Sequence, residues 1–215
     1  VFLVGFFRSH ALLSQQLRKI QESDGKLREL VYVDASTGLR TTHAQRERMG
    51  ALIKAQTPFA LLALNMDDFR LVNDNLGPTG GDAIIAGAAA AIRAAVLADG
   101  EVARAAGAEF TVLVTGDVDS QHLRAVGQRI LDGLTHPLRY NDVRIHLGMS
   151  IGIARCPVDT LEIDELLRLA NVAVHEAKNL GGRCICQYEL AMDEVARQNL
   201  WLDHNLRAAL DAMQF

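Results

Sequence analysis

The sequence lacks the features that mark secreted, membrane-spanning or nucleic-acid-binding chains. Three cysteines in 215 residues are few and odd in number, which argues against a disulfide framework and favours reduced thiols in the cytoplasm. The N-terminal apolar run, residues 1–7, is far shorter than the roughly 20 residues that a membrane span needs. Lysine and arginine total 22 against 26 acidic residues, so no cationic excess attracts a phosphate backbone. We therefore expect no nucleic-acid partner.

Prolines number only four and aromatic residues make up only 5%, but hydrophobic residues make up 49%, enough for one substantial core. Residues 59–66 are almost continuously apolar, which is typical of a strand buried on both faces. Further strands are expected over residues 102–106, 109–115, 137–140, 143–154 and 183–188, and helices over residues 67–76, 79–97, 120–134 and 162–179. This mixture, with consecutive strands in hairpins, predicts an α+β domain with helices against a sheet.

Both ends of the chain have helical patterns. Between residues 10 and 33, apolar side chains recur at coiled-coil spacings of three and four, with Asp24 occupying the missing position of the stripe: Leu13, Leu17, Ile20, Leu27 and Val31. This stripe is compatible with a two-stranded stalk that passes a signal from an upstream element, and equally with a helix that lies on its own domain. From residue 189 onward the pattern is again helical.

Polar residues gather where the apolar run 59–66 ends. Asn65, Asp67 and Asp68 stand at this end, and Glu109 follows a glycine-containing turn between two expected strands. Carboxylate and amide oxygens in such a layout are suited to holding metal ions against a polyphosphate. This end of the strand is therefore the candidate functional site.

Five segments, in order, resemble the motifs of GGDEF domains, the diguanylate cyclase family. Residues 65–82 resemble the D-x-D-x-F-K-x-x-N-D-x-x-G-H-x-x-G-D signature, and residues 104–110 resemble R-x-G-G-D-E-F. The others are residues 34–39 (D-x-L-T-G-L), 150–154 (S-I-G-I-A) and 177–181 (A-K-x-x-G). Together the five segments are specific, although any one alone would be weak.

The resemblance implies an α+β fold, a nucleotide-cyclase or ferredoxin-like palm whose central, mostly antiparallel five-stranded sheet is flanked by helices. The GGDEF domain would cover residues 34–188. Residues 1–33 would be the end of an upstream element and a signalling helix, and residues 189–215 a linker helix at the start of an EAL phosphodiesterase domain. Such chains act in bacterial cyclic di-GMP signalling, in the cytoplasm or in the cytoplasmic part of a membrane-bound sensor.

The resemblance also implies a reaction, in which two GTP-loaded domains meet and each 3′-hydroxyl attacks the other's α-phosphate while Mg²⁺ offsets the charge. The family binds the metal through the first acid of D-x-D, the backbone carbonyl after it, and two acids of the turn. Here these positions are occupied by Asn65, Met66, Ala108 and Glu109. The two glycine positions of the turn are occupied by Ala106 and Gly107. Glu109 alone keeps a carboxylate, so we predict a catalytically degenerate domain with a weak metal site at best.

The nucleotide-binding positions are better kept. The resemblance assigns guanine contacts to Asn73 and Asp82 and places Phe69, Arg70 and Lys178 beside the nucleotide. An amide and a carboxylate together can read the guanine edge. Structural roles are also open, because Asn73 would suit a helix end and Asp82 lies in a first helical turn, where negative charge is favourable.

Three functions are therefore compatible with the sequence. The first is a degenerate regulatory module that dimerises, binds GTP and controls an attached EAL domain in response to an upstream sensor. The second is an active cyclase in which Asp67 or Asp68 assists Glu109 in binding Mg²⁺. The third is a structural dimerisation spacer without a ligand.

Overall fold

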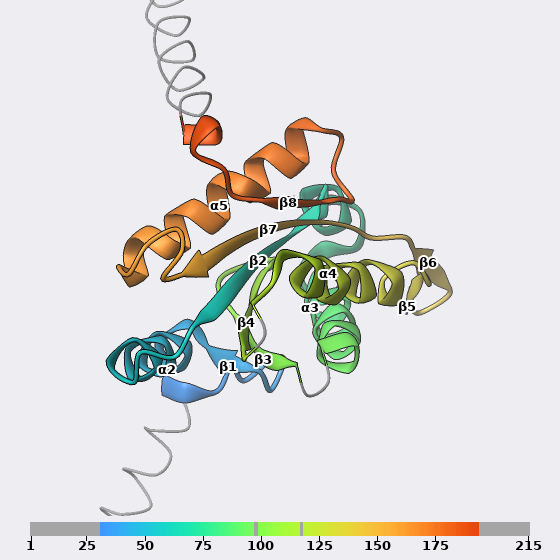
Figure 1. Cartoon of the computed structure of the whole chain (residues 1–215). Coiled ribbons are helices and arrows are strands. Elements are labelled where there is room, and N and C mark those ends of the chain that lie inside the picture. The colour runs from blue at the N-terminus through green and yellow to red at the C-terminus, as the bar shows by residue number, and fades with distance from the viewer. Residues whose placement is uncertain (1–30, 97–98, 117, 194–215) are drawn as a thin grey trace, which may run out of the picture.

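A six-stranded sheet with the order β1-β3-β4-β2-β7-β8 forms the centre of the molecule (Figure 1). The computed structural model describes residues 31–96, 99–116 and 118–193. The strands are β1 (Arg40–Thr41), β2 (Phe59–Asp67), β3 (Gly100–Arg104), β4 (Glu109–Thr115), β7 (Gly148–Cys156) and β8 (Ile185–Gln187). β2 pairs antiparallel with both β4 and β7, whereas β1 with β3 and β7 with β8 pair in parallel.

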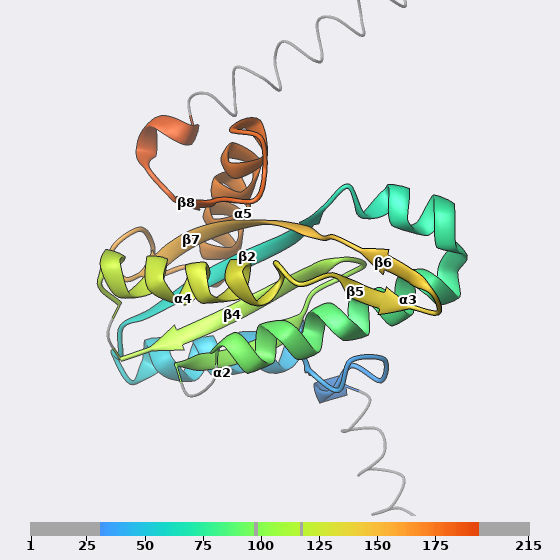
Figure 2. The same cartoon turned by 90° about the vertical axis from the view of Figure 1, so that its right-hand side faces the viewer.

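Helices cover both faces of this sheet. Helices α3 (Phe69–Val96) and α4 (Ser120–Gly133) lie on one face, and α2 (Thr42–Lys54) and α5 (Ile163–Asn179) lie on the other. A separate hairpin of β5 (Leu138–Tyr140) and β6 (Val143–Ile145) packs against α3 (Figure 2). The result is a sheet between two helical layers.

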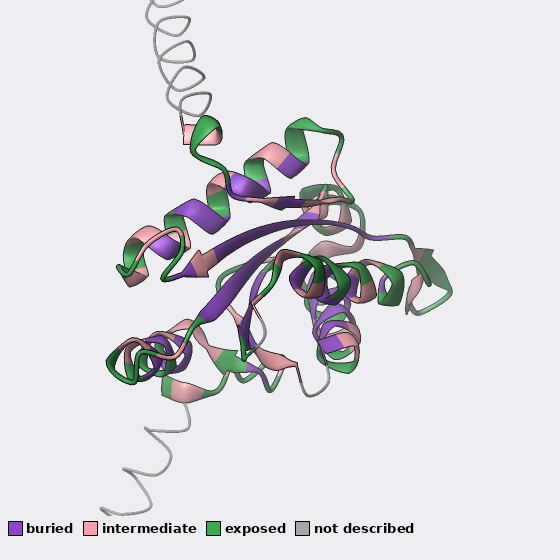
Figure 3. Cartoon of the chain, in the orientation of Figure 1, coloured by how far each residue is buried: buried purple, intermediate pink, exposed green. Residues whose placement is uncertain are grey.

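The alternation of side chains along β2 explains why both faces are covered. Leu62 and Leu64 point toward α3 and α4, while Leu61 and Ala63 point toward α2 and α5, and all four are buried. A strand that is apolar on both faces needs two helical layers to remove it from water. Figure 3 shows this burial along the central strands β2 and β7.

Helix α3 changes direction within its range. Gly77 has φ 70° and ψ 175°, and Pro78 follows it, so two helical segments meet at a kink (Figure 2). The expectation of two helices, over residues 67–76 and 79–97, is confirmed in this sense. Within the described part of the chain, α3 is the one helix long and apolar enough to cross a membrane, yet its apolar side chains pack against the sheet like those of a core helix.

Gly152 in β7 lets α5 approach the sheet closely. A Cβ atom at this position would lie 2.1 Å from the carbonyl oxygen of Ala170 and 2.4 Å from the backbone nitrogen of Val174. Both are backbone atoms of α5, so they cannot move aside as a flexible side chain would. The glycine of the S-I-G-I-A segment is therefore required by packing.

The predicted fold class is confirmed, but the predicted number of strands is wrong. The domain is α+β with a mostly antiparallel sheet, and that sheet has six strands where five were expected. The additional strand is β1, which has two residues and pairs with β3 through Arg40 and Thr41. So short a strand has no apolar alternation for a sequence pattern to reveal.

Two further expectations need correction. Residues 143–154 are not one strand, because β6 pairs with β5 beside α3 whereas β7 pairs with β2 in the main sheet. Helix α2 has no counterpart among the predicted elements, since its buried positions are a mixed set: Ala44, Gln45, Met49 and Leu52. Most of residues 10–33 and of the helix predicted after residue 189 lie outside the described residues, so those expectations stay predictions.

Candidate functional site

Three side chains from three elements meet at the end of β2. Asn65 donates a hydrogen bond from its amide nitrogen to Glu109 Oε1 at 2.9 Å. Lys178, in the last turn of α5, donates to the amide oxygen Asn65 Oδ1 at 2.9 Å. Asn65 and Glu109 are direct partners on β2 and β4, which brings their side chains together. A neutral amide thus connects a base and an acid in one chain of hydrogen bonds.

An amide suits this position because it offers both a donor and an acceptor. A carboxylate at residue 65 would accept from Lys178, but it would face the carboxylate of Glu109 with no donor between them. Two carboxylates that share a site repel each other unless a cation or a proton separates them. With Asn65 in this place, the cluster needs no metal ion to offset its charges.

The turn between β3 and β4 borders this cluster. The backbone N–H of Glu109 donates to the carbonyl of Ala106 at 2.9 Å, and Gly107 has a φ of 53°. The carbonyl of Ala108 accepts from the N–H of Met66 at 3.2 Å, which ties the turn to the end of β2. Gly107 is therefore the turn residue whose backbone favours glycine. Ala106 and Ala108 do not adopt a positive φ, so alanine fits at both.

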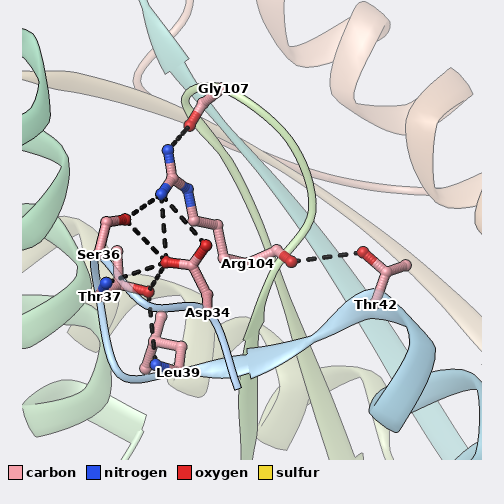
Figure 4. Close-up of polar contacts among 7 residues, drawn as sticks. All are labelled: Asp34, Ser36, Thr37, Leu39, Thr42, Arg104 and Gly107. Atoms are coloured by element: carbon pink, nitrogen blue, oxygen red, sulfur yellow. Dashed lines mark hydrogen bonds and ion pairs between the residues drawn. The ribbon is translucent and has the colours of Figure 1, made fainter. Parts of the chain in front are cut away.

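Arg104 holds the same turn from the other side (Figure 4). Its guanidinium donates to both carboxylate oxygens of Asp34, at 3.1 and 3.4 Å, and to the carbonyl of Gly107 at 3.1 Å. The hydroxyl groups of Ser36 and Thr37 donate to Asp34 as well. Residues 34–37 and Arg104 therefore brace the turn from the N-terminal side of the domain.

The bracing network keeps Asp34 ionised. Partial burial raises the pKa of Asp34, but the hydrogen bonds from Thr37, Ser36 and Arg104 outweigh it and lower this pKa from 3.8 to about 2. The Asp34 side chain is 26% exposed and that of Arg104 only 15%. Because the charged form is favoured in the folded protein, the network stabilises the fold at neutral pH.

An open cavity of about 510 Å³ adjoins these residues. It is lined by the strand end, the turn, the start of α3 and the end of α5: Asn65, Met66, Asp68, Phe69, Arg70, Ala106, Gly107, Ala108, Glu109 and Lys178. Its volume lies in the range of small-molecule pockets. Arg70 is exposed and lies 3.9 Å from Asp74 one turn along α3, a weak surface ion pair that leaves its charge available. The structure thus gathers around one cavity the residues that the family resemblance predicts to contact metal and phosphate.

Asn73 and Asp82 lie further along α3, on the two sides of its kink, and do not line this cavity. Gly81 lets the two segments approach, since a Cβ atom there would lie 1.9 Å from Asn73 Oδ1. Both side chains are exposed, and neither forms a hydrogen bond with the described residues. The two predicted guanine contacts are therefore brought near each other and kept available to a ligand.

The two aspartates after Asn65 differ in their surroundings. Asp67 accepts from the Ser150 hydroxyl at 2.7 Å and from the backbone N–H of Arg183 at 3.0 Å, so both carboxylate oxygens hold β7 and the residues before β8 in place. Asp68 has a φ of 53°, is exposed and lines the cavity. Across residues 31–96, 99–116 and 118–193, no group of three histidine, cysteine or acidic side chains is arranged to hold a metal ion. This donor set does not fit a two-metal site.

Two features of the site escape sequence reasoning. The motifs at residues 34–39 and 104–110 are visible in the sequence, but their joining through Asp34 and Arg104 is a tertiary contact between distant segments. Arg183, which stands near a basic position of the motif, does not line the 510 Å³ cavity. Its side chain crosses Gly148, where a Cβ atom would lie 3.0 Å from it, and lines a second cavity beside α4.

The palm-like sheet and the polar cavity at the end of β2 define a nucleotide-cyclase type of domain. The family model described as "Diguanylate cyclase, GGDEF domain" matches residues 31–184. The chain therefore belongs to the GGDEF family, and it is a GGDEF domain of the cyclic di-GMP signalling class.

Relatives of known name support this assignment. The chain is 32% identical over 196 residues to the cyclic di-GMP phosphodiesterase PdeR of Escherichia coli. This aligned region covers 90% of this chain and 29% of PdeR. It is 32% identical over 162 residues to the bifunctional diguanylate cyclase/cyclic di-GMP phosphodiesterase MucR of Pseudomonas aeruginosa, which covers 75% of this chain and 24% of MucR. The chain thus spans less than a third of the length of these relatives.

Solved structures agree on the fold. The GGDEF domain of YfiN (TpbB) from Pseudomonas aeruginosa superimposes with a TM-score of 0.70 at 25% identity, covering 77% of this chain and 99% of that domain. A protein from M. capsulatus, described as an EAL/GGDEF domain protein, superimposes with a TM-score of 0.62 at 35% identity, covering 67% of this chain and 94% of the other.

Proposed function

We propose that this GGDEF domain is a catalytically degenerate regulatory module that binds a guanine nucleotide without a divalent metal ion. The observation that carries the proposal is the chain of hydrogen bonds from Lys178 through the Asn65 amide to Glu109. It joins a phosphate position and a metal position of the family directly to each other. The cluster is balanced in charge without Mg²⁺, and so it is suited to rest in a metal-free state.

Loss of the metal positions argues against catalysis. Joining two GTP molecules develops charge on the triphosphates that the protein must offset with cations. Asn65 offers a neutral oxygen in place of a carboxylate, Ala108 offers no side-chain ligand, and Glu109 is engaged by Asn65. Each 1.4 kcal/mol of lost charge stabilisation lowers a rate by a factor of about ten. Absence of two carboxylates would therefore lower the rate by several orders of magnitude.

The nucleotide half of the site supports binding. Asn73 and Asp82 have exposed side chains without hydrogen bonds to the described residues, and Arg70 extends an exposed guanidinium at the cavity. Lys178 is held by a single hydrogen bond to a neutral amide, which a phosphate can displace. The nucleotide would gain base contacts and two cations, while the carboxylate of Glu109 would keep its affinity for a triphosphate low.

One observation favours a second function, a weakly active cyclase. Asp68 is an exposed carboxylate that lines the same cavity as Glu109, so it is the better placed of the two candidate substitute ligands. Asp67 is occupied by Ser150 and Arg183. In this alternative, Asp68 and Glu109 would share one Mg²⁺.

The larger protein that we propose has an upstream sensor and a downstream EAL phosphodiesterase domain, and it acts as a cytoplasmic homodimer. The chain covers only 29% of PdeR and 24% of MucR, so each relative has room for further domains. A relative of known structure is described as an EAL/GGDEF domain protein. In such a chain, nucleotide binding to this domain would alter the activity of the attached phosphodiesterase.

A reconstitution experiment tests the loss of catalysis. We expect the purified chain with GTP and Mg²⁺ or Mn²⁺ to form no cyclic di-GMP, measured by chromatography. The triple variant Asn65→Asp, Ala106→Gly, Ala108→Asp should gain cyclase activity, and adding Asp82→Ala to it should remove that activity again. Ordinary turnover by the unchanged chain would contradict the proposal. Weak turnover by the unchanged chain that disappears in Asp68→Asn would establish the weakly active alternative.

Calorimetry tests the binding. We expect weak GTP binding whose dissociation constant changes little when Mg²⁺ is added, and loss of that binding in Asp82→Ala. Asp142→Ala, an exposed acid in the turn of the β5–β6 hairpin, serves as the matched control. No heat at millimolar GTP would leave a structural spacer as the better account.

A further inference from the structure

A second cavity in the described residues is distinct from the candidate nucleotide site. It has a volume of about 740 Å³ and lies between α4 and the edge strand β8, on the face of the sheet opposite α5. We call it the α4 groove and define it by Arg124, Leu147, Met149, Arg183 and Ile185, which bound it. The α4 groove and the candidate nucleotide cavity share no lining residue.

The floor of the α4 groove is apolar and firmly held. Leu147 and Met149 are 9% and 1% exposed, and both belong to the main core cluster beneath α4. Ile185, half-buried in β8, packs against the same cluster and contacts α4 at Gly127. Because these side chains are part of the core, the floor is formed before any ligand arrives, which reduces the entropy lost on binding.

The rim of the groove is basic. Arg124 comes from α4, His146 from the segment before β7, and Arg183 from the segment before β8. None of the three side chains has a hydrogen bond or an ion pair with the residues that the structure describes. The one acid of the lining, Asp132, accepts from Gln128 at 2.9 Å. In a chain of net charge −4, this cavity is thus bordered by two arginines and a histidine and by a single acid.

The hairpin next to the groove adds a second, independent sign of an anion. Arg139 in β5 and Arg144 in β6 are direct partners across the hairpin, and both are exposed. Like charges directly opposite each other on two strands are unfavourable. His146, on the rim of the groove, follows β6 by one residue. The basic surface therefore continues from the groove onto the hairpin, which is the arrangement expected where an anionic ligand offsets the repulsion.

We propose that the α4 groove is a second ligand site, which takes a phosphorylated aromatic small molecule of the nucleotide class. Its phosphates would bind Arg124 and Arg183, whose guanidinium groups match phosphate geometry in two-pronged hydrogen bonds. Its ring would lie on Leu147, Met149 and Ile185. The volume of about 740 Å³ accommodates a ligand of that size. The amide and the carboxylate of the groove, Gln128 and Asp132, are hydrogen-bonded to each other, whereas Asn73 and Asp82 have no such partner among the described residues, so we expect the groove not to select guanine.

Calorimetry with ATP, without metal and at low ionic strength, tests this site, because ATP lacks the guanine edge that Asn73 and Asp82 would read. We expect one ATP per chain, bound at least tenfold more weakly by the double variant Arg124→Gln, Arg183→Gln. Arg93→Gln, which removes an exposed arginine of α3 outside the groove, is the matched control and should bind as the parent does.

Inorganic tripolyphosphate separates the two halves of the proposal, since it presents the charge without the ring. We expect it to bind more weakly than ATP and to depend on the same two arginines. Absence of ATP binding, equal binding by the double variant, or an equal loss in Arg93→Gln would overturn the site. Tripolyphosphate that binds as tightly as ATP would overturn the role of the apolar floor. If the double variant does not fold by thermal melting, the two single variants give the same comparison.

Discussion

Two polar clusters border the turn at residues 104–109, and they are held together differently. The Asp34–Arg104 cluster is an ion pair with hydroxyl donors, and its two charged side chains are only 26% and 15% exposed. The Asn65 cluster has a neutral amide at its centre, between two exposed charged residues. The first keeps the Asp, Thr and Arg of its motifs and has Ser36 where the motif has leucine, and the second has an amide where the motif has an acid. Relative to the motifs, the charged pair that stabilises the fold is therefore present, whereas the acid at residue 65 is not.

This contrast predicts that changes in the structural motifs will affect stability far more than changes at the metal positions. The largest effect is expected for Gly152→Ala, because the new methyl group would collide with the α5 backbone at Ala170 and Val174. We expect a loss of about 3 kcal/mol in the free energy of unfolding, measured by urea denaturation.

The matched control for this change is Gly50→Ala in α2. A Cβ atom there meets only Ile163 Cδ1, at an ordinary 3.9 Å. Because alanine has a higher helix propensity than glycine, this variant should be more stable than the parent by about 0.5–1 kcal/mol. Equal stability of the two variants would show that α5 does not depend on the close approach at Gly152.

An intermediate effect is expected for Asp34→Asn, which removes the charge from the bracing network. The folded-state pKa of Asp34 is lowered from 3.8 to about 2, so its contribution is fully present above pH 4 and is lost as the pH falls toward 2. We expect the variant to be about 2 kcal/mol less stable than the parent at pH 7.

Urea denaturation between pH 7 and pH 2 measures this effect. The difference between parent and variant should shrink over the interval from about pH 4 to pH 2, because the parent then loses the same charge. Asp68→Asn, which changes an exposed aspartate that lines the cavity, is the control and should alter stability little at any pH. A pH-independent difference for Asp34→Asn would show that the hydrogen bonds matter and the charge does not.

The smallest effect is expected for Asn65→Asp, which restores a carboxylate opposite Glu109. Without metal, repulsion between the two carboxylates and attraction to Lys178 nearly cancel, so the loss of stability should be at most about 1 kcal/mol. Added Mg²⁺ should raise the melting temperature of the variant and leave that of the parent unchanged, as measured by thermal denaturation.

Asn141→Asp, in the exposed β5–β6 turn, makes the same change of charge away from Glu109 and should show no response to Mg²⁺. If the parent itself were stabilised by Mg²⁺, the contrast between the two clusters would fail, because the site would already hold a metal ion.

Much of the fold could be predicted from local patterns. The continuous apolar run of β2 indicates a strand between two helical layers, and the kink of α3 follows from Gly77 and Pro78. The short strand β1 and helix α2 could not be predicted in this way. β1 is defined only by the pairing of two residues with β3, which is a contact between distant segments. Helix α2 buries a polar residue, Gln45, whose amide donates to the backbone carbonyls of Glu101 and Thr111.

The composition of the candidate site was also visible before its geometry. The family resemblance predicts Asn65, Ala108 and Glu109 to stand at metal-binding positions, of which only Glu109 has a carboxylate. The hydrogen bonds by which Asn65 joins Glu109 to Lys178 could not be predicted, because these two residues lie 44 and 113 positions from Asn65 along the chain. The surroundings of Arg183 were equally hidden, since its side chain turns over Gly148 toward the α4 groove and away from the candidate nucleotide site.

The sequence by itself determined the family of this chain and the absence of carboxylates at residues 65 and 108, because motif order and residue chemistry are properties of the chain. The tertiary structure decided what the remaining groups do. Hydrogen bonds and charges act over a few ångströms, so whether Glu109 is free or engaged, and on which side of the sheet Arg183 lies, depends on how distant segments pack. The amide of Asn65 can join Glu109 to Lys178 only because the fold brings both partners within 2.9 Å of it.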